Sequence, residues 1–383
     1  MHLCYLTPEY PHPVIGRSGG LGSSIKNLAE QLVREGVQVT VVVTGQKTQR
    51  LFNDQGIFFH VLKHRHYAFG GFYLYRKHIE RYLNILIRDT HIDLVEAPDW
   101  TGMTAFMKLK VPLVIRFNGS DAYFCKLDGR PQKKKNYWFE KRALLGANHL
   151  LSVSAFTANV TKALFQLKKD IKIIPNSIDT ARFQPQPEKE LPGRVLYFGT
   201  LIRKKGVLEL PEIFNLVNRK LPDTKFIFAG KDVPDVITGQ STKAMIVAGM
   251  TPETQHQTLF LEELPYEAIR EEIAKATVVV LPSFAEALPM TWLEAMAMEK
   301  ALVTSDIGWA KEVMVNGETG YTVAPKNHEE FALRITELLK ASELRKQLGK
   351  QARERVLERF STEVVTLQNI KFYKSIVKTK TVE

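Results

Sequence analysis

The feature that most constrains the fold is an alternation of short apolar segments with longer amphipathic ones, which is present in both halves of the sequence. Residues 37–44 are almost wholly apolar and β-branched, as expected for a strand that is buried on both faces of a sheet. Residues 21–35 precede them and carry apolar side chains at helical spacing. The repeated pattern predicts an α/β architecture in which helices cover parallel sheets. The apolar positions of this predicted helix are Ile25, Leu28, Ala29 and Leu32.

The chain of 383 residues is longer than one hydrophobic core usually supports, so we expect two domains. Residues 183–193 contain three prolines without periodicity and indicate a linker. We predict an N-terminal domain over residues 1–185, a C-terminal domain over 186–360, and a helix over 361–383 that packs back on the first domain. The other predicted strands are residues 3–7, 57–62, 93–97, 112–117, 150–154, 171–175, 195–199, 226–230, 244–248, 278–281, 301–305 and 321–323.

Composition narrows the class of protein and its location. The two cysteines, Cys4 and Cys125, are too few for a disulfide framework and form no metal-type cluster, which favours a reducing compartment. No apolar run approaches the roughly 20 residues that a membrane span needs. The N-terminal residues are interrupted by proline and glutamate and do not read as a signal peptide. We expect a cytoplasmic protein that is at most peripheral to a membrane.

The positive charge is concentrated in the first half of the sequence. The net charge is +12, and residues 1–188 contain 26 lysines and arginines against 15 aspartates and glutamates. Such an asymmetry indicates a polyanionic or membrane-surface partner for the N-terminal half. An enzyme that is basic only because its substrates are acidic would show the same excess, so both interpretations stay open.

Two glycine-containing segments follow predicted strands and are candidate phosphate sites. The cluster Gly19, Gly20 and Gly22 lies at a helix start, where backbone N–H groups attract anions, and Arg17 adds a cation. The segment GTLIRKKG, residues 199–206, lies at the carboxyl end of a strand, where open α/β sheets bind ligands. A simple capped turn and a solvated basic turn are the respective structural alternatives.

The basic residues of this second segment are predicted at a helix start, where cations are disfavoured unless an anion is bound. They are Arg203, Lys204 and Lys205.

The strongest candidate site is the segment SFAEALPMTWLEAMAM, which contains two glutamates, Glu286 and Glu294. Pro289 suits the first turn of a helix, and the residues after Glu286 are otherwise uncharged, so the helix should be largely buried. A carboxylate in such a setting is costly unless it is paired or accepts a ligand hydroxyl. A salt bridge from Glu294 to a neighbouring helix is the structural alternative.

Taken in order, these and other segments resemble the retaining glycosyltransferases of family four, the group 1 glycosyltransferases, which have the GT-B fold. The resemblance covers nearly the whole chain and implies two Rossmann-like β/α/β domains that face each other across a cleft. It also implies transfer of a hexosyl-type sugar from a nucleoside-diphosphate sugar with retention of configuration, in cell-envelope or exopolysaccharide biosynthesis. The segments are SGGLG, FNGSD (117–121), SVSAFT (152–157), IIPNSID (173–179), GTLIRKKG, LPYEAI (264–269), LPSFAEALPMTWLEAMAM and SDIGWAKEVMVNGETGY.

The resemblance also implies roles for particular residues. Glu294 would accept hydrogen bonds from the ribose hydroxyls, Glu286 would face the donor sugar, and Lys205 would clamp the diphosphate. Glu286, Lys205 and Asn118 would then be the catalytic residues. The remaining donor-binding residues would be Gly20, Gly22, Thr200, Arg203, Leu288, Pro289 and Met290. The sequence has no Asp-x-Asp motif, so we expect neither a metal ion nor another cofactor to be required.

Three positions depart from the family pattern. Thr200 stands where the family usually has arginine, which weakens a two-cation diphosphate clamp unless Arg203 substitutes for it. Asn118 stands where histidine is frequent; it can hydrogen-bond a sugar hydroxyl but cannot supply a proton. Asn176–Ser177 replaces the common Asn–Gly.

Other functions on the same scaffold compete with this one. A nucleotide-sugar epimerase would need an acid/base set, which Asn118 disfavours. A non-catalytic sugar-nucleotide binding protein is favoured mildly by Thr200 and Asn118, whereas the presence of Lys205 and both glutamates argues against it. A dehydrogenase is disfavoured because no acidic residue ends the second strand.

The acceptor side is predicted from charge. Asp121 is the last residue of FNGSD, and Lys133, Lys134 and Lys135 follow it closely. These basic residues, interleaved with aromatic ones, suit an anionic membrane surface or a lipid-linked acceptor, and a solvated loop is the alternative. No nucleic-acid motif accompanies the charge. Residues 64–75 and 121–136 are expected to be specificity loops. The other basic and aromatic residues are Lys126, Arg130, Tyr123, Phe124, Tyr137 and Trp138.

Overall fold

The computed structural model describes residues 1–16 and 18–379 of the chain, which divide into two compact units. The first unit consists of Met1–Ser177 together with the described part of the segment that begins at Thr362. The second unit is Ile178–Ser361. The boundary therefore falls at Ser177, before the predicted position after residue 185, and the proline-rich residues 183–193 lie inside the second unit.

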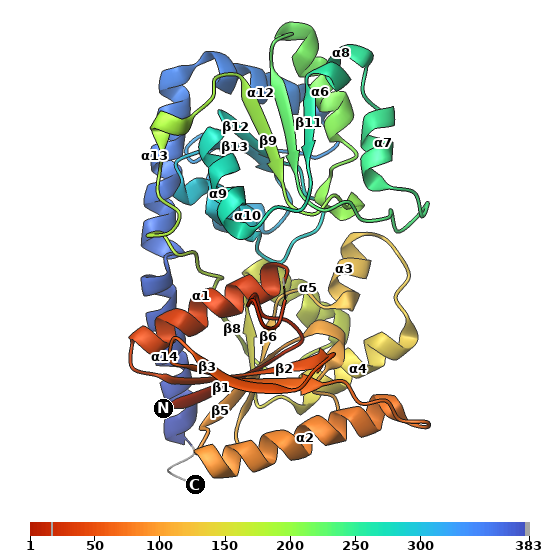
Figure 1. Cartoon of the computed structure of the whole chain (residues 1–383), viewed down its shortest axis with the longest axis vertical. Helices are drawn as coiled ribbons and strands as arrows, with labels where there is room; N and C mark the ends of the chain where they lie inside the picture. The colour runs from red at the N-terminus through yellow and green to blue at the C-terminus, as the bar shows by residue number, and fades with distance from the viewer. Residues whose placement is uncertain (17, 380–383) are drawn as a thin grey trace. The chain divides into compact units, whose positions relative to one another are not determined.

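The first unit is built on an eight-stranded sheet with the order β3-β4-β2-β1-β5-β6-β7-β8 (Figure 1). Its neighbouring strands pair in parallel, except that β3 runs antiparallel to β4. The strands are β1 His2–Thr7, β2 Gln38–Gln46, β3 Arg50–Asp54, β4 Ile57–Lys63, β5 Leu94–Pro98, β6 Leu113–Phe117, β7 His149–Ser152 and β8 Ile171–Ile173. The helices are α1 Gly20–Arg34, α2 Gly71–Thr90, α3 Asp121–Leu127, α4 Lys134–Gly146, α5 Ala155–Phe165 and α14 Thr362–Thr379.

Alternate residues of the central strands enter two different hydrophobic clusters, because successive side chains of a strand point to opposite faces. Leu3 and Tyr5 of β1 pack with side chains of α1 and α14. Cys4 and Leu6 pack with side chains of α2, α4 and α5. Both faces of the sheet are thus covered, which accounts for the nearly continuous apolar character of β1 and β2.

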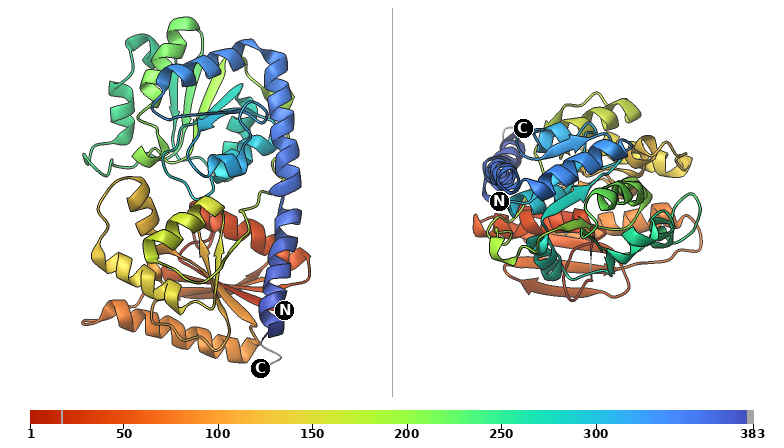
Figure 2. Two further views of the ribbon diagram at one scale, coloured as in Figure 1. Left: turned by 180° about the vertical axis from the view of Figure 1, so that it is seen from behind. Right: turned by 90° about the horizontal axis from the view of Figure 1, so that it is seen from above.

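The second unit contains a six-stranded sheet with the order β11-β10-β9-β12-β13-β14, and all of its neighbouring strands pair in parallel. Helices α6 and α12 pack together on one face, and α9 and α10 lie on the other (Figures 1 and 2). The strands are β9 Arg194–Phe198, β10 Lys225–Ala229, β11 Thr258–Leu261, β12 Val278–Leu281, β13 Ala301–Ser305 and β14 Tyr321–Val323. The helices are α6 Leu210–Lys220, α7 Thr242–Ala248, α8 Pro252–His256, α9 Tyr266–Lys275, α10 Met290–Ala297, α11 Ala310–Val313, α12 His328–Lys340 and α13 Ser342–Arg359.

One predicted strand is wrong and two strands were not predicted. Residues 244–248 belong to helix α7, because the Ser241 side chain accepts a hydrogen bond from the Ala244 N–H and caps the helix. The edge strands β3 and β11 have only exposed or half-buried residues. Polar residues flank the two apolar ones of β3, and the apolar run of β11 is only three residues long.

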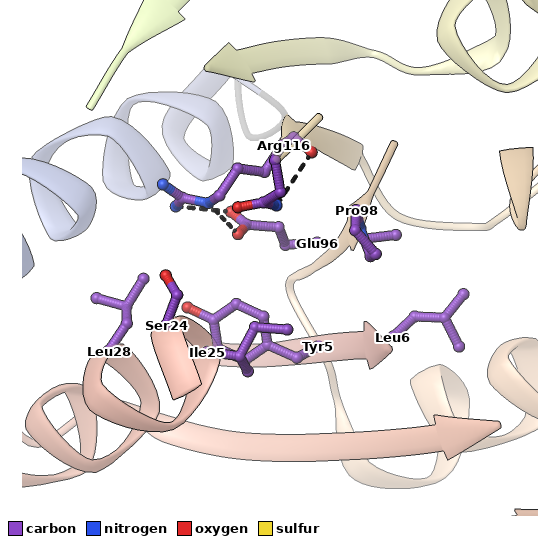
Figure 3. Close-up of a pocket in the computed structure, with 10 residues that line it drawn as sticks. Tyr5, Leu6, Ser24, Ile25, Leu28, Glu96, Pro98 and Arg116 are labelled. Carbon is purple, nitrogen blue, oxygen red and sulfur yellow. Dashed lines mark hydrogen bonds and ion pairs between the residues drawn. The ribbon is translucent and has the colours of Figure 1, made fainter. Parts of the chain in front are cut away.

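The C-terminal helix α14 is attached to the first sheet by a buried polar network. Arg116 of β6 forms an ion pair with Glu96 of β5, with 2.7 Å between Nε and Oε1. From α14, the Tyr373 hydroxyl donates to Glu96 Oε2 over 2.7 Å, and Asn369 Oδ1 accepts from Arg116 Nη2 over 2.6 Å. Figure 3 shows the Arg116 guanidinium lying alongside the Glu96 carboxylate, with Ser24 of α1 beside them. All four network side chains are buried, so each charge depends on its partners.

No helix in the described part of the chain is both long enough and apolar enough to cross a lipid bilayer.

The network gives a prediction about stability. Arg116→Met leaves the Glu96 carboxylate buried without its cation, so the free energy of unfolding should fall by about 3–5 kcal/mol. The double variant Glu96→Leu/Arg116→Met removes both charges and should recover most of this loss. Urea unfolding of the wild type, both single variants and the double variant measures the coupling. Losses that simply add in the double variant would contradict it.

Candidate functional site

Three of the predicted site residues lie together in the second unit, near the carboxyl ends of β9 and β12. Lys205 ends a 3₁₀ turn, Arg203–Lys205, that follows β9, and Glu286 lies in the loop between β12 and α10. Lys205 Nζ is 2.8 Å from Glu286 Oε1, and Ser283 Oγ donates to the same oxygen over 3.2 Å. The charge of Lys205 also acts on Glu294 in α10. Lys205 is therefore paired with Glu286 and also acts electrostatically on Glu294.

Backbone contacts fix the two loops that carry Lys205 and Glu286. The Lys204 carbonyl accepts hydrogen bonds from the N–H groups of Phe284 and Ala285, over 2.8 and 3.2 Å. Gly206 has φ +70°, and a Cβ there would lie 1.9 Å from the Pro282 carbonyl oxygen. Only glycine permits this close packing, which explains why the basic turn ends in Gly206. The predicted helix start at the basic residues is wrong, because α6 begins only at Leu210.

Glu294 is the most buried carboxylate of this group, with 5% of its surface exposed. Burial raises the pKa of Glu294 to about 7, and the hydrogen bond from Tyr266 and the charges of Lys205 and Arg182 act in the opposite direction. The Tyr266 hydroxyl donates to Oε1 over 2.9 Å. The partner on the neighbouring helix α9 is thus a phenol, not the cation of the alternative salt bridge.

Helix α10 is buried over almost its whole surface, as its sequence predicts. Pro289 is the N-cap residue, with φ −73° and ψ 115°, and not a residue of the first turn. Its N-cap residue makes no side-chain cap hydrogen bond, and no acidic residue lies in its first turn. The N–H groups of this first turn carry a partial positive charge, and Glu286 lies in the loop that leads into the helix.

Arg203 lies on the same turn as Lys205 but has a different partner. Its Nε and Nη2 donate to the two carboxylate oxygens of Asp235, over 2.7 and 2.9 Å. The Arg203 guanidinium beside Asp235 holds the pKa of that carboxyl well below its usual range. In this structure Arg203 therefore does not replace the diphosphate-binding arginine that the family usually has at position 200. The residue at that position, Thr200, accepts a hydrogen bond at its carbonyl from the Tyr197 hydroxyl over 2.9 Å.

In the first unit, the glycine cluster forms the start of helix α1, with Gly19 as the N-cap and Gly20 as the first helical residue. An internal anion already lies there, because Glu9 Oε1 accepts from the N–H groups of Gly19 and Gly22, over 3.2 and 3.0 Å. Glu9 was not predicted from the sequence. The first turn of α1 has no acidic residue of its own, and this could have indicated that a carboxylate from outside the helix caps it. Arg17 lies outside the described residues.

Asn118 follows β6 and is fixed from both sides. Its Nδ2 donates to the Arg116 carbonyl over 3.3 Å, and its N–H donates to Asp99 Oδ1 over 3.0 Å. Asp99, which follows β5, is 1% exposed, and burial raises its pKa to about 8. Asp99 was not predicted from the sequence. Ser177 also departs from the family pattern, and its backbone carbonyl accepts a hydrogen bond from Asn27 Nδ2 of α1 over 3.1 Å.

The acceptor-side residues are mainly helical and not in loops as expected. Asp121 lies in the first turn of α3 and accepts a hydrogen bond from Asn136 over 3.0 Å. Lys133 is the N-cap of α4, and Lys134 and Lys135 begin that helix with exposed side chains. The other expected loop ends at Gly71, where α2 begins.

Within residues 1–16 and 18–379, no group of three or more His, Cys, Asp or Glu side chains is arranged to hold a metal ion.

Two protein families match successive parts of the sequence. The family "Glycosyltransferase Family 4" matches residues 18–182, and "Glycosyl transferases group 1" matches residues 179–355. Together they cover both units. The chain belongs to the group 1 glycosyltransferases. The predicted family is thereby confirmed.

Relatives of this glycosyltransferase differ in what their names say they do. It is 24% identical to an uncharacterized glycosyltransferase of Methanocaldococcus jannaschii, with 98% of each chain covered. It is 28% identical to an alpha-maltose-1-phosphate synthase of Mycolicibacterium smegmatis, over 62% of this chain and 66% of that one. A capsular polysaccharide biosynthesis glycosyltransferase of Staphylococcus aureus is 22% identical, with 63% of this chain and 65% of that one covered.

Solved structures confirm the GT-B class of fold for this glycosyltransferase. Sucrose-phosphate synthase of Thermosynechococcus elongatus has a TM-score of 0.80 at 17% identity, with 99% of this chain and 100% of that one covered. HepE of Anabaena, in complex with UDP and glucose, has a TM-score of 0.75 at 16% identity, with 98% and 100% covered.

The pKa of Glu294 gives a prediction that needs no substrate. An unfolded glutamate has a pKa of about 4.3, so the folded protein binds this proton more tightly than the unfolded chain does. This contribution to stability is complete below about pH 4 and is lost as the pH rises through about 7. The wild type should therefore lose roughly 2–4 kcal/mol more than Glu294→Gln between pH 4 and 8. Urea unfolding at several pH values measures the difference, and parallel profiles would contradict the raised pKa.

Proposed function

We propose that this glycosyltransferase transfers a hexosyl-type sugar from a nucleoside-diphosphate sugar to a carbohydrate or lipid-linked acceptor, with retention of configuration and without a metal ion. The observation that carries the proposal is the cluster of Lys205, Glu286 and Glu294 beside the start of helix α10. This group offers a cation and helix N–H groups to a diphosphate, and carboxylates to sugar hydroxyls.

Each residue of the cluster has a distinct part in the proposed reaction. Glu294, which already accepts one hydrogen bond from Tyr266, accepts further hydrogen bonds from the ribose hydroxyls. Lys205 exchanges its partner Glu286 for the diphosphate when the donor binds, and Glu286 then faces the donor sugar. Negative charge grows on the diphosphate as its bond to the sugar breaks, so a fixed cation at that point stabilises the transition state more than the ground state.

In the retaining reaction, the bond between the sugar C1 and the diphosphate oxygen breaks. The acceptor oxygen forms its bond to C1 on the same face of the ring. The proton of the acceptor hydroxyl passes to the departing phosphate oxygen, so no protein base is required. Asn118, held by Asp99 and Arg116, contributes a hydrogen bond to a sugar hydroxyl and no proton.

Turnover and nucleotide-binding assays distinguish this function from two alternatives on the same scaffold. A nucleotide-sugar epimerase would convert the donor without an acceptor. A non-catalytic binding protein would bind the nucleotide without turnover, and the intact ion pair of Lys205 with Glu286 argues against an eroded site.

The names of relatives support a choice of substrates to test. The structure of HepE contains UDP and glucose, and other relatives are named for glycogen, maltose-1-phosphate and capsular polysaccharide synthesis. UDP-sugars are accordingly the first donors to test, and a growing glycan on the cytoplasmic side of the membrane is the proposed acceptor, in cell-envelope or exopolysaccharide biosynthesis.

We further propose an anionic membrane surface as a partner of the first unit. Tyr123 and Phe124, expected beside the lysines, are buried and play no part in it. The exposed aromatics near Lys133–Lys135 are Trp138 of α4 and, from the start of α2, Phe72 and Tyr73. Lys135 Nζ lies 5.1 Å from the Phe72 ring centre. Exposed aromatics with adjacent cations suit the headgroup region of an anionic membrane.

The proposed function predicts unequal roles for the two cations of the basic turn. Lys205→Ala should lower the turnover number by about 10²–10³, and the affinity for the free nucleoside diphosphate less. Arg203→Ala should have a much smaller effect on turnover, because Arg203 is bonded to Asp235. Steady-state kinetics at saturating donor, with EDTA present throughout, and calorimetry with UDP, GDP and ADP provide the measurements. If turnover is intact and affinity alone falls in Lys205→Ala, Lys205 is only a docking residue, and inactivity in EDTA would overturn the metal-free reaction.

The membrane surface is tested separately. The wild type should sediment with vesicles that contain phosphatidylglycerol and remain in solution with pure phosphatidylcholine, and added salt should weaken the binding. Replacing Lys133, Lys134 and Lys135 with glutamine should reduce the bound fraction several-fold, since each basic residue contributes about 1 kcal/mol near an anionic surface. The matched control replaces three exposed lysines of the second unit, Lys311, Lys340 and Lys350. An equal loss in the control would contradict the assignment.

A further inference from the structure

Trp100 is an exposed residue in a turn whose backbone is held by contacts with neighbouring elements. Strand β5 ends at Pro98, whose partner in β6 is Arg116, so the turn that follows β5 lies beside the segment that contains Asn118. Trp100 begins this turn, Trp100–Gly102, and 40% of its surface is exposed. The turn that carries Trp100 therefore lies in the part of an open α/β sheet where ligands bind, beyond the carboxyl ends of the strands.

The backbone of this turn is strained and held from outside. Thr101 has φ 50° and ψ 18°, a left-handed conformation that a β-branched residue rarely adopts. Arg76 of α2 donates to the carbonyls of Thr101 and Gly102, over 3.2 and 3.1 Å. Gly102 has φ +58°, and a Cβ there would lie 2.3 Å from the backbone of Phe139 in α4. Such strain persists only where surrounding contacts impose it, and it is concentrated at functional sites.

The residue before Trp100 ties the turn to Asn118. Asp99 Oδ1 accepts the Asn118 N–H over 3.0 Å, and the other oxygen, Oδ2, is buried without a hydrogen-bond partner. A buried side-chain oxygen without a hydrogen-bond partner costs free energy, so this position is not optimised for stability alone. The strain at Thr101 and the unsatisfied oxygen of Asp99 are independent observations on the two residues that flank Trp100.

We propose that Trp100 is a stacking platform for a sugar ring of the acceptor, next to Asn118, which contacts a hydroxyl of the same saccharide. A pyranose has one face of C–H groups and a rim of hydroxyls, so it needs a flat apolar surface with a polar group at the edge. A tryptophan indole supplies a large, rigid surface at little cost in conformational entropy. The fixed turn presents that surface without further ordering when the saccharide binds. This inference rests on the proposed glycosyl transfer and adds a binding site to it.

The test uses the full-length chain with UDP present and the disaccharides maltose, cellobiose and chitobiose as probes. Saturation-transfer difference NMR measures the apparent affinity for each sugar in the wild type, Trp100→Ala and Trp100→Phe. The matched control is Phe58→Ala, which removes an aromatic side chain from β4 of the same unit that is 49% exposed. Circular dichroism confirms that each variant is folded.

We expect at least one disaccharide to receive saturation from the wild type and from Phe58→Ala with equal affinity. Trp100→Ala should weaken that binding roughly tenfold, as truncation of an aromatic anchor does, and Trp100→Phe should weaken it less. Affinity for UDP, measured by calorimetry, should be the same in all four proteins. Equal sugar binding by Trp100→Ala and wild type would overturn the proposal, as would a wild type that binds UDP but none of the sugars. A wild type that binds no nucleoside diphosphate would instead count against the proposed function.

Discussion

The attachment of the last helix to the first sheet depends on a charge pair that water does not reach. Arg116 and Glu96 face each other from adjacent strands, and Tyr373 and Asn369 of α14 complete their hydrogen bonds. A buried ion pair contributes little net stability compared with apolar packing, but it tolerates few alternative partners. The pair therefore specifies where α14 lies as well as holding it there. The same strands continue to Asp99 and Asn118, so the network fixes the base of the segment that the proposed acceptor site uses.

The cations of the basic turn in the second unit form two pairs with carboxylates. Lys205 is paired with Glu286, and Arg203 with Asp235, yet the two pairs differ in kind. The Arg203 pair is bidentate, and Asp235 also accepts hydrogen bonds from Thr238, so its geometry is closed. The Lys205 pair is a single contact in which the ammonium can turn toward another anion. The sequence shows three consecutive cations, whereas the structure distinguishes Arg203, which donates two hydrogen bonds to Asp235, from Lys205, which donates one to Glu286.

The sequence predicts the class of fold well, because strands buried on both faces produce apolar runs that are visible without any tertiary information. It fails where burial is partial, as in the edge strands β3 and β11, and where a cap outweighs an apolar run, as Ser241 does for α7. In the candidate site, the proximity of Lys205 to Glu286 follows from the parallel order of β9 and β12. The roles of Glu9, Asp99 and Trp100 depend on contacts between residues distant in the chain, and no local pattern encodes them.

The carboxylate of Glu9 occupies the N–H groups at the start of helix α1, so an external anion can bind there only by displacing it. A phosphate that binds to these N–H groups exchanges with an anion the chain already supplies, so the helix charge contributes only the difference between the two. Few counterions are released in such an exchange, and the resulting affinity depends weakly on ionic strength. Glu9 lies in the loop that leaves β1, so displacing its side chain removes two hydrogen bonds between that loop and the start of the helix. Occupancy at the helix start and the position of the first loop are thereby linked as a single equilibrium.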